Sequence, residues 1–196
     1  SIYGRGYSLE QIPVHLLTHL TIAFVIPNAD GTICSEEIEK LNIEELFNTT
    51  GVQHGISIGG WGTSKHFVSA TSNEGLRFNL ALNCANLFRC FAKLDYIEID
   101  WEYPEDSRQA EDMFLFIHEL RKQIPSGKGL NLCVPCDKRS DLLELKRLES
   151  FIDLFIVMGY DLSGFWSPRS GFHSALHPCI SSHLLHLLEI VPGDKI

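Results

Sequence analysis

The sequence predicts one α/β domain built around a parallel sheet, and two observations lead to this prediction. Short apolar runs rich in branched residues alternate with longer amphipathic stretches, a pattern that is typical of strands and helices in a parallel sheet. No internal repeat or low-complexity linker interrupts this series over the 196 residues, a length sufficient for one sizeable core. We therefore interpret residues 1–196 as a single domain.

Each predicted strand is a run that is nearly continuous in apolar residues, as expected for strands buried on both faces. The predicted strands are Leu20–Ile26, Gly55–Gly59, Leu94–Trp101, Leu130–Val134 and Leu154–Met158. The amphipathic stretches between and after them predict helices. The predicted helices are Ser35–Phe47, Glu74–Phe91, Ser107–Gln123, Leu142–Ser150 and Ser181–Ile190.

The charge balance narrows the classes of partner. With 25 acidic and 16 basic residues, the formal net charge is −9, which argues against a nucleic-acid backbone or an anionic membrane surface as the main partner. A neutral polymer or a small molecule fits better. The chain has no run of 18 apolar residues, and its opening lacks the apolar stretch of a signal peptide. We expect a soluble chain without a membrane span.

Cysteine and histidine spacings raise the question of a metal or redox site. Cys133 and Cys136 have the spacing of such a pair, but no second pair accompanies them, so packing cysteines are favoured. Three histidine pairs have helical spacing without an adjacent carboxylate, which favours ordinary histidines over zinc ligands. No metal is therefore expected. The pairs are His15/His19, His173/His177 and His183/His186.

The most informative segment is the predicted strand that ends near Trp101. Because side chains alternate along a strand, the acidic residues Glu98, Asp100 and Glu102 share one face. Its other face carries two isoleucines and Trp101, which indicates burial on both sides rather than an edge strand with a solvated acidic face. Crowded, buried carboxylates repel one another, so we expect at least one raised pKa, as a general acid near neutral pH requires.

This segment resembles a signature of glycoside hydrolase family 18. The family carries an Asp-Gly-x-Asp-x-Asp-x-Glu strand, usually followed by Tyr-Pro, and residues 95–104 match it with two departures, Tyr96 for the glycine and Glu98 for the middle aspartate. Residues 57–61, Ser-Ile-Gly-Gly-Trp, resemble the family's Ser-x-Gly-Gly signature. Residues 158–161, Met-Gly-Tyr-Asp, resemble its Met-x-Tyr-Asp signature. The opening residues are similar to fungal members.

The resemblance implies a (β/α)8 TIM barrel that is incomplete here, with about strands 2 to 6 present. By the same resemblance the first, seventh and eighth strands are absent. A five-strand remnant would leave two unpaired edges. We therefore expect either a fragment or a degraded product, and we interpret residues 1–196 as a partial catalytic domain.

The implied activity is that of an endo-type chitinase, which hydrolyses β-1,4 links between N-acetylglucosamine units by a retaining, substrate-assisted mechanism. The resemblance implies no cofactor, chitin or chito-oligosaccharides as partner, and an extracellular or cell-wall location. Two alternatives are a catalytically inactive chitin-binding protein and a non-functional fragment. Trp166 is interpreted equally well as a core residue or a sugar-stacking platform. The implied catalytic residues are Glu102, Asp100 and Tyr160, and the implied substrate-binding residues are Glu98, Asp161, Trp61, Tyr103, Met158 and Trp166.

Overall fold

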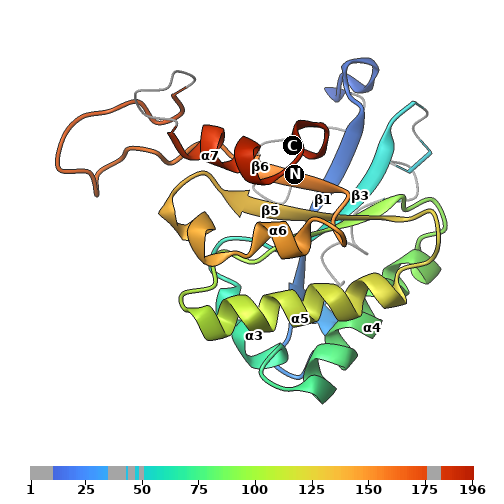
Figure 1. The fold of residues 1–196 in the computed structure, drawn as a ribbon. Coiled ribbons are helices and arrows are strands. Elements are labelled where there is room, and N and C mark those ends of the chain that lie inside the picture. Colours follow the sequence, from blue (N-terminus) through green and yellow to red (C-terminus); the bar gives the residue numbers. More distant parts are fainter. Residues whose placement is uncertain (1–10, 35–42, 44–46, 49–50, 176–181) are drawn as a thin grey trace.

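The computed structural model describes residues 11–34, 43, 47–48, 51–175 and 182–196. Its centre is a six-stranded sheet in the order β2-β1-β3-β4-β5-β6 (Figure 1). All neighbouring strands pair in parallel except the two-residue β2, which is antiparallel to β1. The strands are β1 (His19–Pro27), β2 (Ile33–Cys34), β3 (Gln53–Gly59), β4 (Tyr96–Asp100), β5 (Gly129–Pro135) and β6 (Leu154–Met158). The five predicted strands are thus confirmed, and so is the parallel α/β class.

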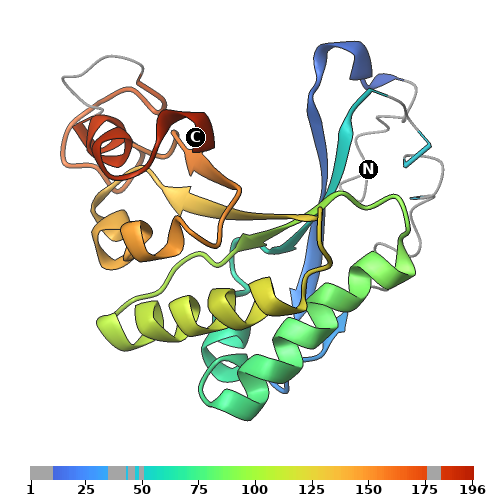
Figure 2. The same cartoon turned by 45° about the vertical axis from the view of Figure 1, so that its right-hand side comes forward.

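Three helices cover one side of this sheet, as the two ribbon views show (Figures 1 and 2). They are α3 (Ser64–Ala70), α4 (Glu74–Cys90) and α5 (Ser107–Gln123). The two long helices begin where an Asn or Asp side chain accepts a hydrogen bond from a backbone N–H of the first turn. Asn73 accepts from Leu76 N at 3.0 Å, and Asp106 accepts from Gln109 N at 2.8 Å.

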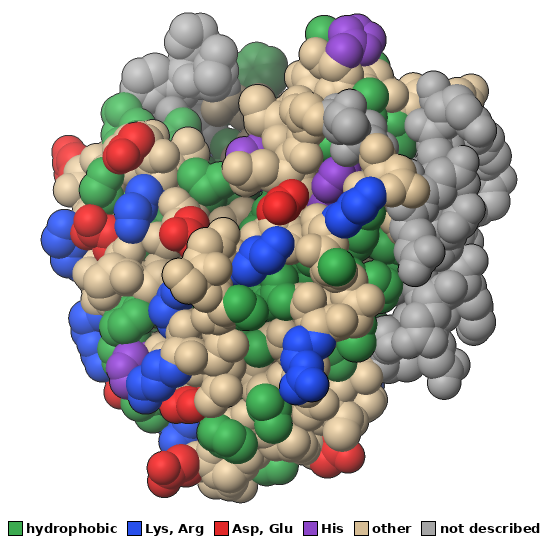
Figure 3. All heavy atoms as spheres, turned by 90° about the vertical axis from the view of Figure 1, so that its right-hand side faces the viewer, with side chains coloured by type: hydrophobic (Ala, Val, Ile, Leu, Met, Phe, Trp, Pro, Cys, Tyr) green, Lys and Arg blue, Asp and Glu red, His purple; other side chains and the backbone are tan. Residues whose placement is uncertain are grey.

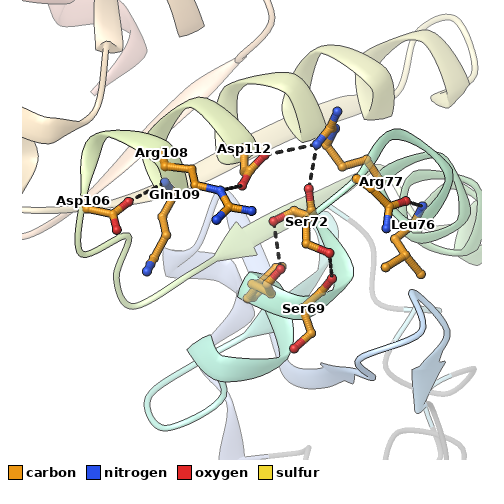
Figure 4. A network of polar contacts seen from close by, with 11 residues as sticks. Ser69, Ser72, Leu76, Arg77, Asp106, Arg108, Gln109 and Asp112 are labelled. Carbon is orange, nitrogen blue, oxygen red and sulfur yellow. Dashed lines mark hydrogen bonds and ion pairs between the residues drawn. The ribbon is translucent and has the colours of Figure 1, made fainter.

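A polar network joins these three helices (Figure 4). The guanidinium of Arg77 donates to the carbonyl oxygen of Thr71 at 2.7 Å and to Asp112 Oδ1 at 3.1 Å. Arg108 lies 3.9 Å from the other oxygen of Asp112. The end of α3 is therefore linked to α4 and α5, which fixes the helical layer that supports β4.

The sequence prediction is wrong for one helix and incomplete elsewhere. In place of a helix over Leu142–Ser150, the structure has a 3-10 helix η3 (Lys138–Leu142) and a single turn α6 (Leu145–Leu148). The chain is extended at Leu143, which turns this side chain into the core together with Leu145 and Leu148. The short elements α3 and β2 were not predicted. Of the predicted helix Ser35–Phe47, only residues 43 and 47 are described, and both are buried.

The remaining elements lie near the two ends of the described chain. Helix α7 (Ser182–Ile190) agrees with the predicted Ser181–Ile190, and the 3-10 helix η4 (Gly193–Lys195) follows it. Near the start of the described chain lies the 3-10 helix η2 (Val14–Leu16). On the face drawn in Figure 3, acidic and basic side chains are interspersed. Among the described helices, none combines the length and apolar character that crossing a bilayer requires.

Candidate active site

The strand β4 separates an apolar face from an acidic one. Trp101, directly after β4, is 1% exposed and stacks on Phe67 of α3, with ring centroids 5.2 Å apart and planes within 9°. Because side chains alternate, Glu98 and Asp100 point to the opposite side of the sheet from Trp101. Both acids are nevertheless buried, with exposed fractions of 8% and 6%. Glu102 follows two residues after Asp100, just beyond the strand.

The acidic face has raised pKa values. Burial raises the pKa of Asp100 to about 7, and the charges of Glu102 and Glu98 add to this effect. Burial also raises the pKa of Glu98, although the Ser57 hydroxyl and the Cys133 thiol nearby partly oppose the increase. Asp100 Oδ1 is buried and makes no hydrogen bond to the described residues. The expectation of a raised pKa among crowded carboxylates therefore holds for Asp100 and Glu98.

Cys133 was interpreted from the sequence as a packing residue. In the structure it is buried beside two acidic side chains rather than among apolar ones alone. It lies on β5, where the register pairs Ile99 with Leu132 and so brings Cys133 beside the end of β4. Its thiol lies beside the carboxyl groups of both Glu98 and Asp100, and its single S–H can donate to one of them. Burial and these two negative charges raise the pKa of the thiol, so it remains a protonated donor. Cys133 and Cys136 are both free thiols.

The Gly-Gly pair after β3 allows the ends of β3 and β4 to approach closely. Gly59 has φ +119°, and a Cβ built on it would lie 2.1 Å from the carbonyl oxygen of Asp100. Gly60 N donates to the same oxygen at 2.9 Å. A side chain at residue 59 would therefore displace the backbone of Asp100.

The third segment is the loop after β6. Met158 is buried at the end of the strand, whereas Tyr160 is 51% exposed. Partial burial and then the charges of Glu102 and Asp100 raise the pKa of Tyr160, so its hydroxyl lies within electrostatic range of both acids. Asp161 follows in a left-handed conformation with φ 57°.

A cleft of about 880 Å³ opens beside these strand ends. Four residues implied by the resemblance line it, and Trp166 is among them with 56% of its surface exposed. The other five implied residues, Glu98, Asp100, Glu102, Met158 and Tyr160, do not line it. The additional lining residues were not assigned to the site from the sequence, because they lie in the segments that follow β5 and β6. The implied lining residues are Trp61, Tyr103, Asp161 and Trp166, and the additional ones are Cys136, Asp137, Arg139, Leu162 and Phe165.

Tyr103 connects the cleft to Glu102. The guanidinium of Arg139 lies 4.1 Å from the centre of the Tyr103 ring, and the ring of Trp61 lies 6.5 Å away at 66°. The Tyr103 side chain hydrogen-bonds with the Glu102 carboxyl group, and burial together with this contact raises the pKa of the tyrosine. Arg139 is itself paired with Asp137. Cation–π and ion-pair contacts thus hold the wall of the cleft next to Glu102.

This arrangement has the elements of acid catalysis on a neutral, ring-shaped substrate. A buried carboxyl with a pKa near 7 lies two residues from a carboxyl beside the cleft, and exposed aromatic rings line the cleft. Within the described ranges, no group of three or more His, Cys, Asp or Glu side chains has the arrangement of a metal site.

The chain is similar in sequence to known chitinases. Chitinase 1 of Aphanocladium album is 28% identical over 209 residues, which cover 90% of this chain and 49% of that protein. Endochitinase 1 of Metarhizium anisopliae is 27% identical over the same shares of the two chains. The chain thus spans about half the length of these curated relatives.

Solved structures show the same fold. A class V chitinase from Nicotiana tobaccum superposes with a TM-score of 0.84 at 21% identity, over 97% of this chain and 62% of that one. A group IV chitinase from Ostrinia furnacalis superposes with a TM-score of 0.84 at 20% identity, over 96% and 59% of the respective chains. The model of the glycosyl hydrolases family 18 matches residues 2–189. This chain therefore belongs to glycosyl hydrolase family 18.

Proposed function

We propose that the chain acts on chitin as an endo-type hydrolase, cleaving β-1,4 links between N-acetylglucosamine units with retention at the anomeric carbon. The observation that carries the proposal is the end of β4, where the buried Asp100, with a pKa raised to about 7, precedes Glu102 beside an aromatic cleft. Family membership and the chitinases among the relatives support the same substrate.

The mechanism follows from the positions of three side chains. Glu102 protonates the leaving glycosidic oxygen and afterwards removes a proton from the attacking water. Substrate-assisted members of this family use the acetamide oxygen of the sugar as the nucleophile in place of a second carboxylate. Asp100 binds the acetamide N–H and stabilises the positive charge that develops, while Tyr160 donates to the acetamide carbonyl.

The other implied residues bind the substrate. Trp61 and Trp166 offer exposed aromatic faces to sugar rings, and Tyr103 and Asp161 supply polar groups along the cleft. Glu98, two residues before Asp100 on the same face, helps to raise the pKa of Asp100 through its charge. Met158 is buried, so its proposed contribution is to the floor beneath the substrate. We place this activity in the extracellular space or the cell wall.

Replacing the proton donor tests the proposal. We expect Glu102→Gln to lower the turnover of a fluorogenic chitobiose reporter by about 10²- to 10⁴-fold, because a general acid contributes about that factor. Binding of N-acetylchitotetraose, measured by calorimetry, should persist. Glu105→Gln is the matched control, since it is the same substitution at an exposed residue three positions further along.

The outcomes distinguish the competing functions. Retention of more than about a tenth of the turnover in Glu102→Gln would contradict the assigned role. A parent chain that binds the tetrasaccharide without cleaving it would instead be a chitin-binding protein. A glucose tetramer, which lacks the acetamide group, should not be cleaved; its hydrolysis at a comparable rate would exclude the substrate-assisted mechanism.

A further inference from the structure

The loop after β6 is folded back on itself next to the proposed site. The backbone N–H of Leu162 donates to the carbonyl oxygen of His173 at 3.0 Å. The hydroxyl of Ser174 donates to the carbonyl oxygen of Gly159 at 2.7 Å. These two bonds join the end of the loop to its start, so that residue 173 lies beside residues 160 and 161.

The His173 side chain contacts both of the site residues in this segment. Its Nε2 lies 2.7 Å from Asp161 Oδ1. Since a carboxylate only accepts hydrogen bonds, Nε2 must carry a proton in this contact. The imidazole ring is parallel to the Tyr160 ring within 6°, with centroids 6.5 Å apart. The proposed reaction assigns His173 no chemical step, and its sequence spacing favoured an ordinary histidine.

The backbone conformation of Asp161 indicates what this contact does. Its φ of 57° lies in the left-handed region, which costs a residue with a Cβ about 1 kcal/mol or more relative to its usual conformations. More than half of the Asp161 and His173 side chains is exposed, so packing does not hold them. The orientation of Asp161 therefore depends on its bond to His173 and on the two bonds that close the loop.

We propose that His173 is a positioning residue for this loop: it orients the Asp161 carboxylate and the Tyr160 ring towards the substrate. The inference rests on the proposed function, because it assigns His173 a role in the same site. It predicts that the hydrogen bond to Asp161 is the larger contribution, since the two rings are offset and distant. A side chain that keeps a donor at this position should then keep most of the effect.

Three variants separate the two contacts of His173. His173→Ala removes both, His173→Gln keeps an N–H donor at the position of Nε2, and His173→Phe keeps only a ring. With a chitobiose reporter, we expect the Ala and Phe variants to lose about three- to tenfold in kcat with a smaller change in KM, as a hydrogen bond of ordinary strength implies. The Gln variant should recover most of the loss.

His186→Ala is the matched control. His186 also faces a carboxylate, Asp141 at 4.0 Å, but neither group belongs to the proposed site. A merely structural role would reduce the melting temperature and leave the rates of the folded fraction unchanged. Nitrogen NMR of the imidazole gives a readout independent of activity: Nε2 should be the protonated nitrogen in the parent chain, and this preference should weaken in Asp161→Asn.

The result also separates this inference from the proposed function. If the parent chain hydrolyses the reporter and His173→Ala behaves like the His186 control, the positioning role is overturned. If the parent chain does not hydrolyse the reporter, the proposed function fails. The affinity for N-acetylchitotetraose then decides whether His173 has the positioning role. A three- to tenfold weaker affinity in His173→Ala, restored in His173→Gln, would support the positioning role, whereas equal affinities would overturn it.

Discussion

The residues on β4 and β5 and those in the loop after β6 are held in position by different physical means. Asp100 and Cys133 are buried, and the parallel register of two strands sets their positions. Tyr160 and Asp161 are exposed, and hydrogen bonds within the loop set theirs. A strand therefore places a side chain through its spacing alone, whereas a loop needs additional contacts.

This difference has an electrostatic counterpart. On β4, burial is the main cause that raises the pKa of Asp100 to about 7. In the loop, solvent screens the pair formed by Asp161 and His173. This pair therefore contributes to the geometry of the loop rather than to the stability of the fold. Changes on the strands should therefore alter stability and titration, and changes in the loop should alter rates and binding.

The largest expected contrast is in the free energy of unfolding, between variants of the buried Trp101 and the exposed Trp166. Trp101→Ala should lower the free energy of unfolding by about 3–5 kcal/mol, because it leaves a cavity against Phe67. Trp166→Ala should change it by less than about 0.5 kcal/mol, because this ring is largely exposed. Urea unfolding followed by circular dichroism measures both. Equal losses in the two variants would show that the loop is part of the cooperative core.

The strands and the residues that they carry are predicted well from the sequence. Continuous apolar runs identify all five parallel strands, and period-two alternation places Glu98 and Asp100 on one face. The loop is different, because the contact between Asp161 and His173 spans twelve residues without regular structure. The roles of Arg139 and Cys133 were also missed, since a cation–π contact and a thiol donor depend on which segments become neighbours.

The interrupted helix after β5 illustrates the same limit. Leu142, Leu143, Leu145 and Leu148 read as an amphipathic helix in one dimension. In the structure, burial of Leu143 in an extended conformation competes with helix formation, and only short helical pieces remain. Tertiary packing overrides local propensity there, because a short helix gains little from its own hydrogen bonds.

The second prediction uses pH to test the burial of Asp100. Its folded-state pKa of about 7 exceeds the unfolded value of 3.8, so the folded state binds more protons between these values. The stability that this group contributes is fully present below about pH 4 and is lost as the pH rises through about 7. The loss is at most about 4 kcal/mol at pH 8, and coupling to Glu98 reduces it.

Asp100→Asn should therefore stabilise the chain at pH 8 by about 1–3 kcal/mol and have little effect at pH 4, since the neutral amide resembles the protonated acid. Urea unfolding at both pH values measures this difference. Asp106→Asn is the control, because Asp106 is exposed and Asn also caps a helix. A stabilisation of Asp100→Asn that is equal at the two pH values would contradict the assigned titration.

The smallest expected effect concerns Cys133. Its single S–H can donate to the carboxyl group of Glu98 or of Asp100, and such a bond favours the charged form of the acid. Removing the donor in Cys133→Ala should therefore raise the midpoint at which these acids titrate, by about 0.4–1 pH unit for a hydrogen bond of 0.5–1.5 kcal/mol. Cys133→Ser keeps a hydroxyl donor of similar size, so its midpoint should remain near that of the parent chain.

Carbon NMR of the carboxyl groups measures these midpoints directly, and Cys136→Ala is the control because the charge that acts on the Cys136 thiol is that of Asp137 rather than that of the β4 acids. The comparison between Ala and Ser separates donation from packing. If Cys133 only fills space, the two variants will differ in stability and share one titration midpoint. If it acts as a donor, the Ala variant alone will shift, and the shift will be upward. A downward shift in the Ala variant would mean that the thiol stabilises the protonated acids, which would reverse the electrostatic account of the β4 face.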